Sequence, residues 1–269
     1  REFIQELFYL WQQRKLTIST FRTAWYSLSK SISILKQLQQ IKVNENTLFY
    51  SYWLDEKSIA LALLKKNNKN IKVISRAHGW DIYEYRHPNK YLPFRNLLIK
   101  KLDTIYTVSN DGLLYLKSNY PEVKNKIQIS PLGTKPLRRV LEKKNENHIE
   151  ILSISSVIPL KRIDKILEVT SQLYKFRIKW THIGDGPSLD TLKSMSSKRV
   201  QENSNFSFEF LGHLPNTEVR NILSNQYFDL FINLSETEGV PVSIMEAQSA
   251  GIPVLATNVG GSGEIVSRE

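Results

Sequence analysis

The fold of this chain is constrained most by two strand–loop–helix units, which follow each other without a gap in the sequence. An apolar run at 228–234 reads as a buried strand, and a helix is predicted at 241–250, because a proline suits its first turn and a glycine follows its end. A second buried strand at 252–257 leads into a glycine-rich turn, and Glu264 opens a further helix. Consecutive units of this kind build a parallel α/β sheet, in which ligands bind where loops leave the carboxyl ends of the strands.

The same alternation of strands and helices extends through the rest of the chain. In the second half, further strands are predicted at 149–155, 176–183 and 206–211, and helices at 162–175, 188–199 and 216–225. In the first half, a helical region at 1–41 precedes strands at 47–52, 71–75, 104–108 and 127–129 and helices at 57–66 and 112–118. The polar stretch at 136–148 is typical of an interdomain linker, so we predict domains at 1–135 and 149–269.

Two acidic residues flank the turn that follows the strand at 228–234. Glu238 lies in the loop and Glu246 in the helix, with seven residues between them. The helix N-terminus between them presents free N–H groups and the positive end of the helix dipole to an anion. The alternative is that both are ordinary solvated acids, but the apolar neighbours of Glu246 indicate a buried turn.

The sequence around this pair, S-x-x-E-G-x-P-x-x-x-x-E-A-x-x-x-G-x-P-V followed by G-G-x-x-E-I-V, resembles the retaining glycosyltransferases of family GT4. The resemblance implies an α/β fold of the GT-B type, in which two Rossmann-like domains with parallel sheets face a cleft. It also implies that Glu238 contacts the sugar of a nucleotide-sugar donor and that Glu246 binds the ribose. The diphosphate is then held at the helix N-terminus, by Gly239, Val240 and Pro241.

The loop after the strand at 149–155 departs from the family pattern G-R-L-x-x-x-K-G. Lys161 matches the lysine of that pattern, but Ser156 replaces its arginine and Arg162 its last glycine. The resemblance implies that Lys161 neutralises the donor diphosphate. Arg162 could restore the charge missing at Ser156, or the leaving-group site could be weaker. Both cations could also belong to a solvated helix start, although cations there oppose the helix dipole.

Two shorter patterns also resemble the family. Gly184 and Gly186 match its G-x-G-P turn, which lines the nucleotide cleft, although glycines could simply make a tight turn here. After the strand at 71–75, His78, Gly79 and Asp81 resemble the acceptor-side loop, in which the histidine lies near the donor sugar. The alternative for this histidine is a purely structural role.

Composition limits the partners. The chain has 269 residues, no cysteine and a formal net charge of +11, which suits nucleotide phosphates, acidic lipid surfaces or nucleic acid, unless it reflects a lysine-rich compositional habit. The apolar stripe of the helical region, formed by Leu28, Ile32, Leu35 and Leu38, either packs on its own domain or belongs to a basic amphipathic surface for an anionic membrane. No apolar run approaches a membrane span.

No cofactor is expected. The five histidines are scattered and the D-x-D pair of metal-dependent glycosyltransferases is absent, so we predict no metal site. The pieces that the family usually has before the first strand and after Val266 are missing, which indicates a fragment truncated at both ends.

We therefore predict a glycosyltransferase that moves a hexosyl unit from a nucleoside-diphosphate sugar to an acceptor hydroxyl with retention, in bacterial surface polysaccharide or glycolipid synthesis. The resemblance implies catalytic roles for His78, Lys161 and Glu238. The predicted partners are the nucleotide-sugar donor, a saccharide or lipid-linked acceptor and an anionic membrane surface, but no nucleic acid. The predicted location is the cytoplasm, at the inner face of its membrane. A nucleotide-sugar epimerase and an inactive sugar-nucleotide binding module remain alternatives.

Overall fold

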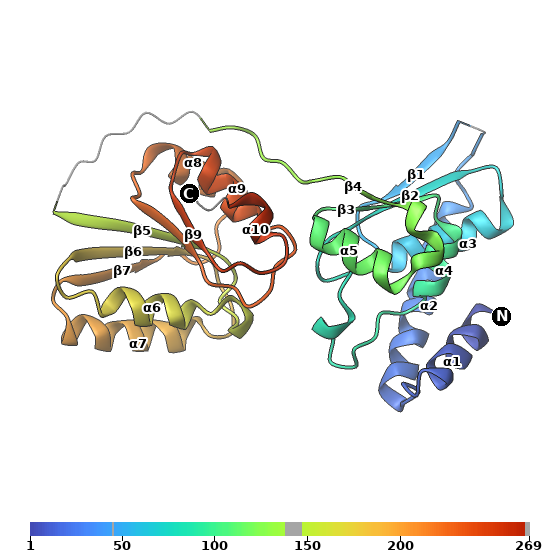
Figure 1. The fold of residues 1–269 in the computed structure, drawn as a ribbon, viewed down its shortest axis with the longest axis horizontal. Helices are drawn as coiled ribbons and strands as arrows, with labels where there is room; N and C mark the ends of the chain where they lie inside the picture. Colours follow the sequence, from blue (N-terminus) through green and yellow to red (C-terminus); the bar gives the residue numbers. More distant parts are fainter. Residues whose placement is uncertain (45, 138–146, 267–269) are drawn as a thin grey trace. The chain divides into compact units, whose positions relative to one another are not determined.

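The computed structural model describes residues 1–44, 46–137 and 147–266. The chain divides into two compact units, Arg1–Pro131 and Leu132–Glu269, and each has its own parallel sheet and hydrophobic core (Figure 1). Most of the predicted linker lies outside the described residues.

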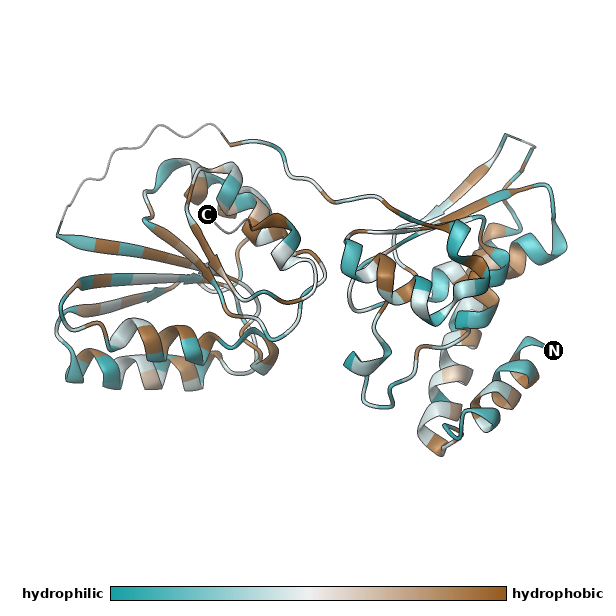
Figure 2. Ribbon diagram, in the orientation of Figure 1, coloured by the Kyte–Doolittle hydropathy of each residue, from teal (hydrophilic) through white to brown (hydrophobic). Residues whose placement is uncertain are grey.

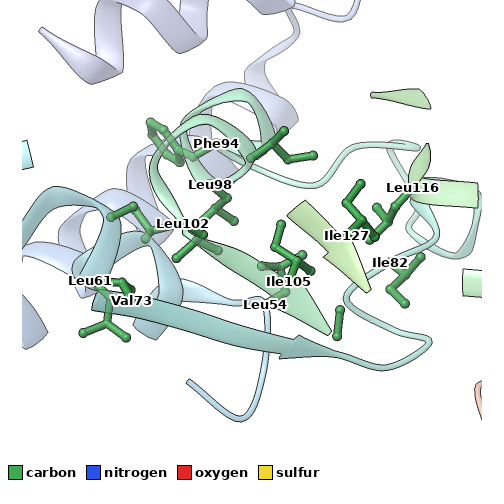
Figure 3. Packing of buried hydrophobic residues seen from close by; sticks show 14 of the residues in the cluster. Leu54, Leu61, Val73, Ile82, Phe94, Leu98, Leu102, Ile105, Leu116 and Ile127 are labelled. Atoms are coloured by element: carbon green, nitrogen blue, oxygen red, sulfur yellow. The ribbon is translucent and has the colours of Figure 1, made fainter. Parts of the chain in front are cut away.

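The first unit is a four-stranded parallel sheet with helices packed around it. Its strands are β1 (Leu48–Ser51), β2 (Lys72–Ala77), β3 (Thr104–Thr107) and β4 (Ile127–Ile129), in the order β1-β2-β3-β4. Its helices are α1 (Glu2–Gln12), α2 (Ile18–Leu38), α3 (Glu56–Asn67), α4 (Arg95–Lys101) and α5 (Asn110–Asn119), with short 3₁₀ turns η1 (Glu84–Arg86) and η2 (Pro121–Lys126). Figure 3 shows Val73, Leu98, Ile105 and Leu116 among the buried residues of this core.

The buried side of α2 contains only part of the predicted apolar stripe. Leu28, Leu35 and Leu38 pack against the core, whereas Ile32 is 41% exposed. The buried residues of α2 are small: Thr20, Ala24, Ser27 and Ser31. Small side chains at this spacing let α2 lie close against α3, and the hydroxyl of Ser31 is satisfied by the carbonyl of Ser27 at 2.6 Å.

The second unit is a five-stranded parallel sheet covered on both faces. Its strands are β5 (His148–Ile154), β6 (Arg177–Ile183), β7 (Phe206–Phe210), β8 (Leu230–Asn233) and β9 (Val254–Ala256), in the order β7-β6-β5-β8-β9. Its helices are α6 (Ile163–Ser171), α7 (Leu189–Glu202), α8 (Asn216–Asn225), α9 (Val242–Ser249) and α10 (Ser262–Ile265), with a 3₁₀ turn η3 (Pro159–Lys161).

Two cores hold these layers together. Adjacent β5 residues point to opposite faces, so Ile151 packs with α6 and α7, whereas Leu152 packs with α8 and α9. In Figure 2 the strands carry hydrophobic residues, and α7 carries hydrophilic residues on the side away from the sheet. The predicted parallel α/β architecture is confirmed in both units.

Candidate functional site

The order of strands in the second unit changes direction at β5. The chain proceeds from β5 to β6 and β7 on one side, and then continues with β8 and β9 on the other. In open α/β sheets, ligands bind outside the carboxyl ends of the strands at such a switch point, because the loops there diverge and leave a crevice. The loops that flank this point are residues 155–162 after β5 and residues 234–241 after β8.

Lys161 and Glu238 meet across the switch point. The Lys161 Nζ atom lies 2.5 Å from the Glu238 Oε1 atom, although 77 positions separate them in the chain. The Glu238 residue is only 7% exposed, so its charge is stabilised by the lysine in a site with little water. The two loops also share a backbone hydrogen bond, from the Glu236 N–H to the Leu160 carbonyl, at 2.9 Å. The structure thus brings together two of the three residues that were predicted to be catalytic.

The glycine turn after β9 supports the loop that carries Glu238. Gly260 has a φ of +51°, and a Cβ atom at this position would lie 2.0 Å from the Glu238 carbonyl oxygen. The Gly261 N–H donates to the Gly239 carbonyl at 2.7 Å. Only glycine combines this left-handed backbone with so close an approach, so the G-G turn positions the Glu238 loop from behind.

Glu246 lies in α9, which starts directly after Val240 and Pro241. Pro241 precedes the first helical residue and offers the first turn no side-chain cap. The Glu246 side chain is buried, and its Oε1 atom accepts a hydrogen bond of 2.8 Å from the Asn216 Nδ2 atom. Sequence reasoning missed Asn216, because a polar residue in the first turn of a helix gives no sign of a partner thirty positions away.

The turn after β6 lies against the loop that leads to Lys161. Gly184 has a φ of +146°, and a Cβ atom there would lie 1.8 Å from the Ser155 carbonyl oxygen. A Cβ atom at Gly186 would lie 2.5 Å from the Val157 carbonyl oxygen. Both glycines therefore allow the backbones of the two loops to touch. Ser156, which lies between Ser155 and Val157 in the chain, is exposed.

Arg162 follows Lys161 in the chain, but the two side chains have different surroundings. Its φ of +51° is in the left-handed region, which explains why the related pattern has glycine at this position. Its side chain lines a hollow of about 360 Å³ beside α6 and α7, together with Asp164, Ser188 and Thr191. The two neighbouring cations thus face different surroundings, since Lys161 pairs with Glu238 and Arg162 lines this hollow.

The remaining predicted residues lie in the first unit, after β2. The ring of His78 is buried with its centroid 4.1 Å from that of Trp53, and neither ring nitrogen has a hydrogen-bond partner among the described residues. Asp81 accepts the N–H of His78 at 2.6 Å and the N–H of Leu54 at 2.8 Å. Its carboxylate therefore holds the loop in place. The Gly79 carbonyl also accepts hydrogen bonds from the Ile82 and Tyr83 N–H groups.

Neither a metal-binding cluster nor a membrane-spanning helix occurs in the described part of the chain. Residues 1–44, 46–137 and 147–266 contain no group of three or more His, Asp or Glu residues placed to hold a metal ion. Over the same ranges, every helix is too short or too polar to cross a membrane.

Comparisons with known proteins agree with this arrangement. The family described as glycosyl transferases group 1 matches residues 135–269. A phosphatidylinositol N-acetylglucosaminyltransferase protein from Arabidopsis thaliana is 25% identical over 255 residues, which cover 92% of this chain and 54% of that protein. The putative colanic acid glycosyltransferase WcaL of Escherichia coli K12 is 28% identical over 214 residues, or 74% of this chain and 50% of the relative. The chain thus spans about half the length of these curated relatives.

Solved structures show the same fold. Staphylococcus aureus TarM superposes with a TM-score of 0.66 and 20% identity, over 87% of this chain and 46% of TarM. Anabaena HepE gives a TM-score of 0.66 with 16% identity, over 88% of this chain and 65% of HepE. Both are GT-B glycosyltransferases. The family match and the two Rossmann-like units together establish that the chain belongs to the glycosyl transferases group 1 family and has the GT-B type of fold.

Proposed function

We propose that the chain transfers a hexosyl unit from a nucleoside-diphosphate sugar to an acceptor hydroxyl, with retention at the anomeric carbon. The observation that carries this proposal is the meeting of Lys161 and Glu238 at the switch point, beside the helix that contains Glu246. The family supports glycosyl transfer, and solved structures of similar fold contain UDP, UDP with glucose, or UDP-glucose. Uridine diphosphate sugars are therefore the first donors to test.

The reaction must stabilise a departing diphosphate. The acceptor oxygen bonds to the anomeric carbon, the bond from that carbon to the diphosphate breaks, and the acceptor proton leaves with the nucleoside diphosphate. Lys161 and the N–H groups at the start of α9 supply positive charge to this leaving group through charge-assisted hydrogen bonds. As the diphosphate draws Lys161 toward itself, Glu238 becomes available to accept hydrogen bonds from the donor sugar.

Glu246 anchors the ribose in this proposal. Asn216 occupies one of its carboxylate oxygens, and the other accepts from the ribose hydroxyls. Replacement of Glu246 by alanine should weaken nucleotide binding by about 1.5–3 kcal/mol, the cost of a hydrogen bond to a charged group. His78 contributes on the acceptor side.

A labelled UDP-sugar tests the reaction. Transfer of label to an acceptor supports the proposal, whereas conversion of the donor alone indicates an epimerase, and binding without turnover indicates an inactive binding module. Lys161→Ala should lower turnover about 10²–10³-fold, the usual cost of removing one preorganised electrostatic group. The matched control is Lys165→Ala, since Lys165 is an exposed lysine of α6 that pairs with Glu168. Equal rates for the two variants would refute the role of Lys161.

Catalysis is proposed to need no divalent metal, because Lys161 and the start of α9 supply the positive charge. Transfer should continue in EDTA at its rate in magnesium. Loss of activity in EDTA and its recovery with magnesium or manganese would contradict this part of the proposal.

We also propose that the protein works at the inner face of the cytoplasmic membrane, on a surface polysaccharide or glycolipid acceptor. The α1–α2 region exposes large apolar side chains, among them Phe8, Trp11 and Trp25, and two basic residues, Arg14 and Arg22, lie in the same region. This combination suits an anionic lipid surface. In co-sedimentation, binding should appear with anionic vesicles at low salt, and weaken when Arg14 and Arg22 become Gln. Equal binding to neutral vesicles, or none, would contradict it.

A further inference from the structure

A buried amide lies beside the carboxylate of Glu238 and has no part in the reaction proposed above. Asn233 is the last residue of β8 and is only 6% exposed, whereas the three residues before it in the strand are apolar. Burying an amide costs free energy unless its oxygen and nitrogen find hydrogen-bond partners. The partners of Asn233 therefore indicate what this polar side chain does at the end of a core strand.

The two ends of the Asn233 amide contact two different parts of the loop that follows β8. Its Oδ1 atom accepts a hydrogen bond of 3.1 Å from the Ser235 N–H, and its Nδ2 atom donates to the Glu238 Oε1 atom at 3.5 Å. Because an N–H group needs an acceptor and a carboxylate needs a donor, these partners also determine which end of the amide is the oxygen. The side chain thus joins the start of the loop to the carboxylate that was predicted to contact the donor sugar.

Glu238 receives two donors on the same oxygen, and they differ in how they respond to a diphosphate. The Lys161 Nζ atom lies 2.5 Å from Oε1, but it is a charge on a flexible four-carbon stem, which an anion can draw away. The Asn233 amide is neutral, and its side chain is short. The Thr257 N–H also donates to the Asn233 carbonyl at 3.0 Å, which fixes the main chain at the end of β8. Asn233 therefore keeps its place beside Oε1 after Lys161 has turned to the diphosphate.

Thr257 provides a comparison, because it supports the main chain of the same loop. Its hydroxyl donates to the Ser235 carbonyl at 2.6 Å. A substitution of this hydroxyl disturbs the loop, whereas a substitution at Asn233 also disturbs the Glu238 side chain. The loop leads directly into α9, whose start was proposed to hold the diphosphate, so a loosened loop should weaken binding of the nucleotide as well as of the sugar.

We propose that Asn233 is a positioning residue for the donor sugar: its amide holds the Glu238 carboxylate in place while Lys161 turns to the diphosphate. A carboxylate that is already oriented accepts hydrogen bonds from the sugar hydroxyls at a lower entropic cost than a mobile one. Asparagine suits this role because its Nδ2 atom is a donor, whereas an aspartate of the same shape would repel the carboxylate. The inference rests on the proposed function and adds a residue to its donor site.

The test compares the binding of UDP with that of a UDP-sugar to the intact chain, by calorimetry. UDP-glucose, UDP-galactose and UDP-N-acetylglucosamine are titrated first, and the one that binds the unmodified chain most tightly is used. Asn233→Ser removes the donor to Glu238 without adding charge. It should weaken binding of the UDP-sugar at least about threefold, and change the affinity for UDP less than about twofold.

A second variant, Asn233→Asp, supplies a pH readout that a purely structural residue lacks. At pH 8 it should weaken UDP-sugar binding at least about fivefold more than UDP binding, because two carboxylates then face each other. Two carboxyl groups in contact share a proton, so acidification returns a donor to the position of Nδ2. Relative to the unmodified chain, the loss of UDP-sugar affinity should therefore shrink at least about threefold between pH 8 and pH 5.5. Lys161 faces Glu238 in every variant, so its effect cancels in these ratios.

Thr257→Val and Asn225→Asp are the matched controls. Thr257→Val removes a hydrogen bond from the loop, so any loss should affect UDP and the UDP-sugar by the same factor. Asn225→Asp adds the same charge at an exposed asparagine of α8 and should bind both ligands as the unmodified chain does. Circular dichroism and urea unfolding check that each variant folds.

The outcomes separate this inference from the proposed function. Equal losses of UDP and UDP-sugar affinity in Asn233→Ser, or no loss of either, assign Asn233 to the structure of the loop and overturn the positioning role. A loss in folded Asn233→Asp that does not change with pH also overturns it. Binding of the UDP-sugar without transfer by the unmodified chain overturns the proposed reaction alone, because the affinities still decide the role of Asn233. Absence of any UDP-sugar binding overturns both.

Discussion

Replacement of Gly260 by alanine should destabilise the second unit and loosen the loop that carries Glu238. The added Cβ atom would lie 2.0 Å from the Glu238 carbonyl oxygen, with φ at +51°. A left-handed backbone costs a non-glycine residue about 1–2 kcal/mol, and forcing a methyl group into a packed site adds about 1–3 kcal/mol. The expected loss in the free energy of unfolding is therefore about 2–5 kcal/mol.

Gly251 provides the matched control. It has a φ of +70°, but a Cβ atom there would meet nothing within 4 Å, so Gly251→Ala should lose only the backbone contribution of about 1–2 kcal/mol. Urea unfolding followed by circular dichroism gives both values, and calorimetry gives the affinity for UDP. Gly260→Ala should also bind UDP more weakly, whereas Gly251→Ala should not. Equal stability losses in the two variants, or an unchanged UDP affinity in folded Gly260→Ala, would refute the reasoning.

Three further predictions follow from individual side chains. Burial lowers the pKa of His182 to about 4, so below pH 6.5 the unfolded chain binds a proton that the folded chain refuses. Urea unfolding at several pH values should therefore show that about 3 kcal/mol of unfolding free energy is lost between pH 7 and pH 4 because of His182. His182→Gln should abolish this pH-dependent loss, whereas the control His213→Gln, at an exposed histidine, should retain it. Arg162→Gly should raise the unfolding free energy by about 0.5–1 kcal/mol, because relief of the left-handed strain exceeds the added chain entropy of glycine; a lower value would contradict the strain argument. Asn216→Ala should weaken UDP binding about tenfold by releasing the Glu246 carboxylate, and unchanged calorimetric affinity would show that Asn216 has no positioning role.

Local sequence patterns were sufficient for most elements of this fold. The strand at 127–129 and the helix at 216–225 have the predicted bounds, because apolar periodicity and turn residues act within a few positions of the chain. The helix α4 was missed, since it has only seven residues and follows Phe94 in a left-handed conformation, which no local pattern announces. The apolar stripe of α2 did not reveal that its most buried positions hold small residues, which close packing against α3 selects.

The candidate site divides in the same way. The motif alone singled out Glu238, Glu246 and Lys161, because loops at the ends of parallel strands need particular glycines, prolines and charges. Only the tertiary structure decided their partners: Lys161 meets Glu238 across the switch point, and Asn216 holds Glu246. It also decided that Asp81 ties the backbone of its own loop, at His78, to the backbone of the loop after β1, at Leu54. The physical reason is that these contacts depend on the order of strands in the sheet, and strand order is set by packing between distant segments, which local periodicity does not encode.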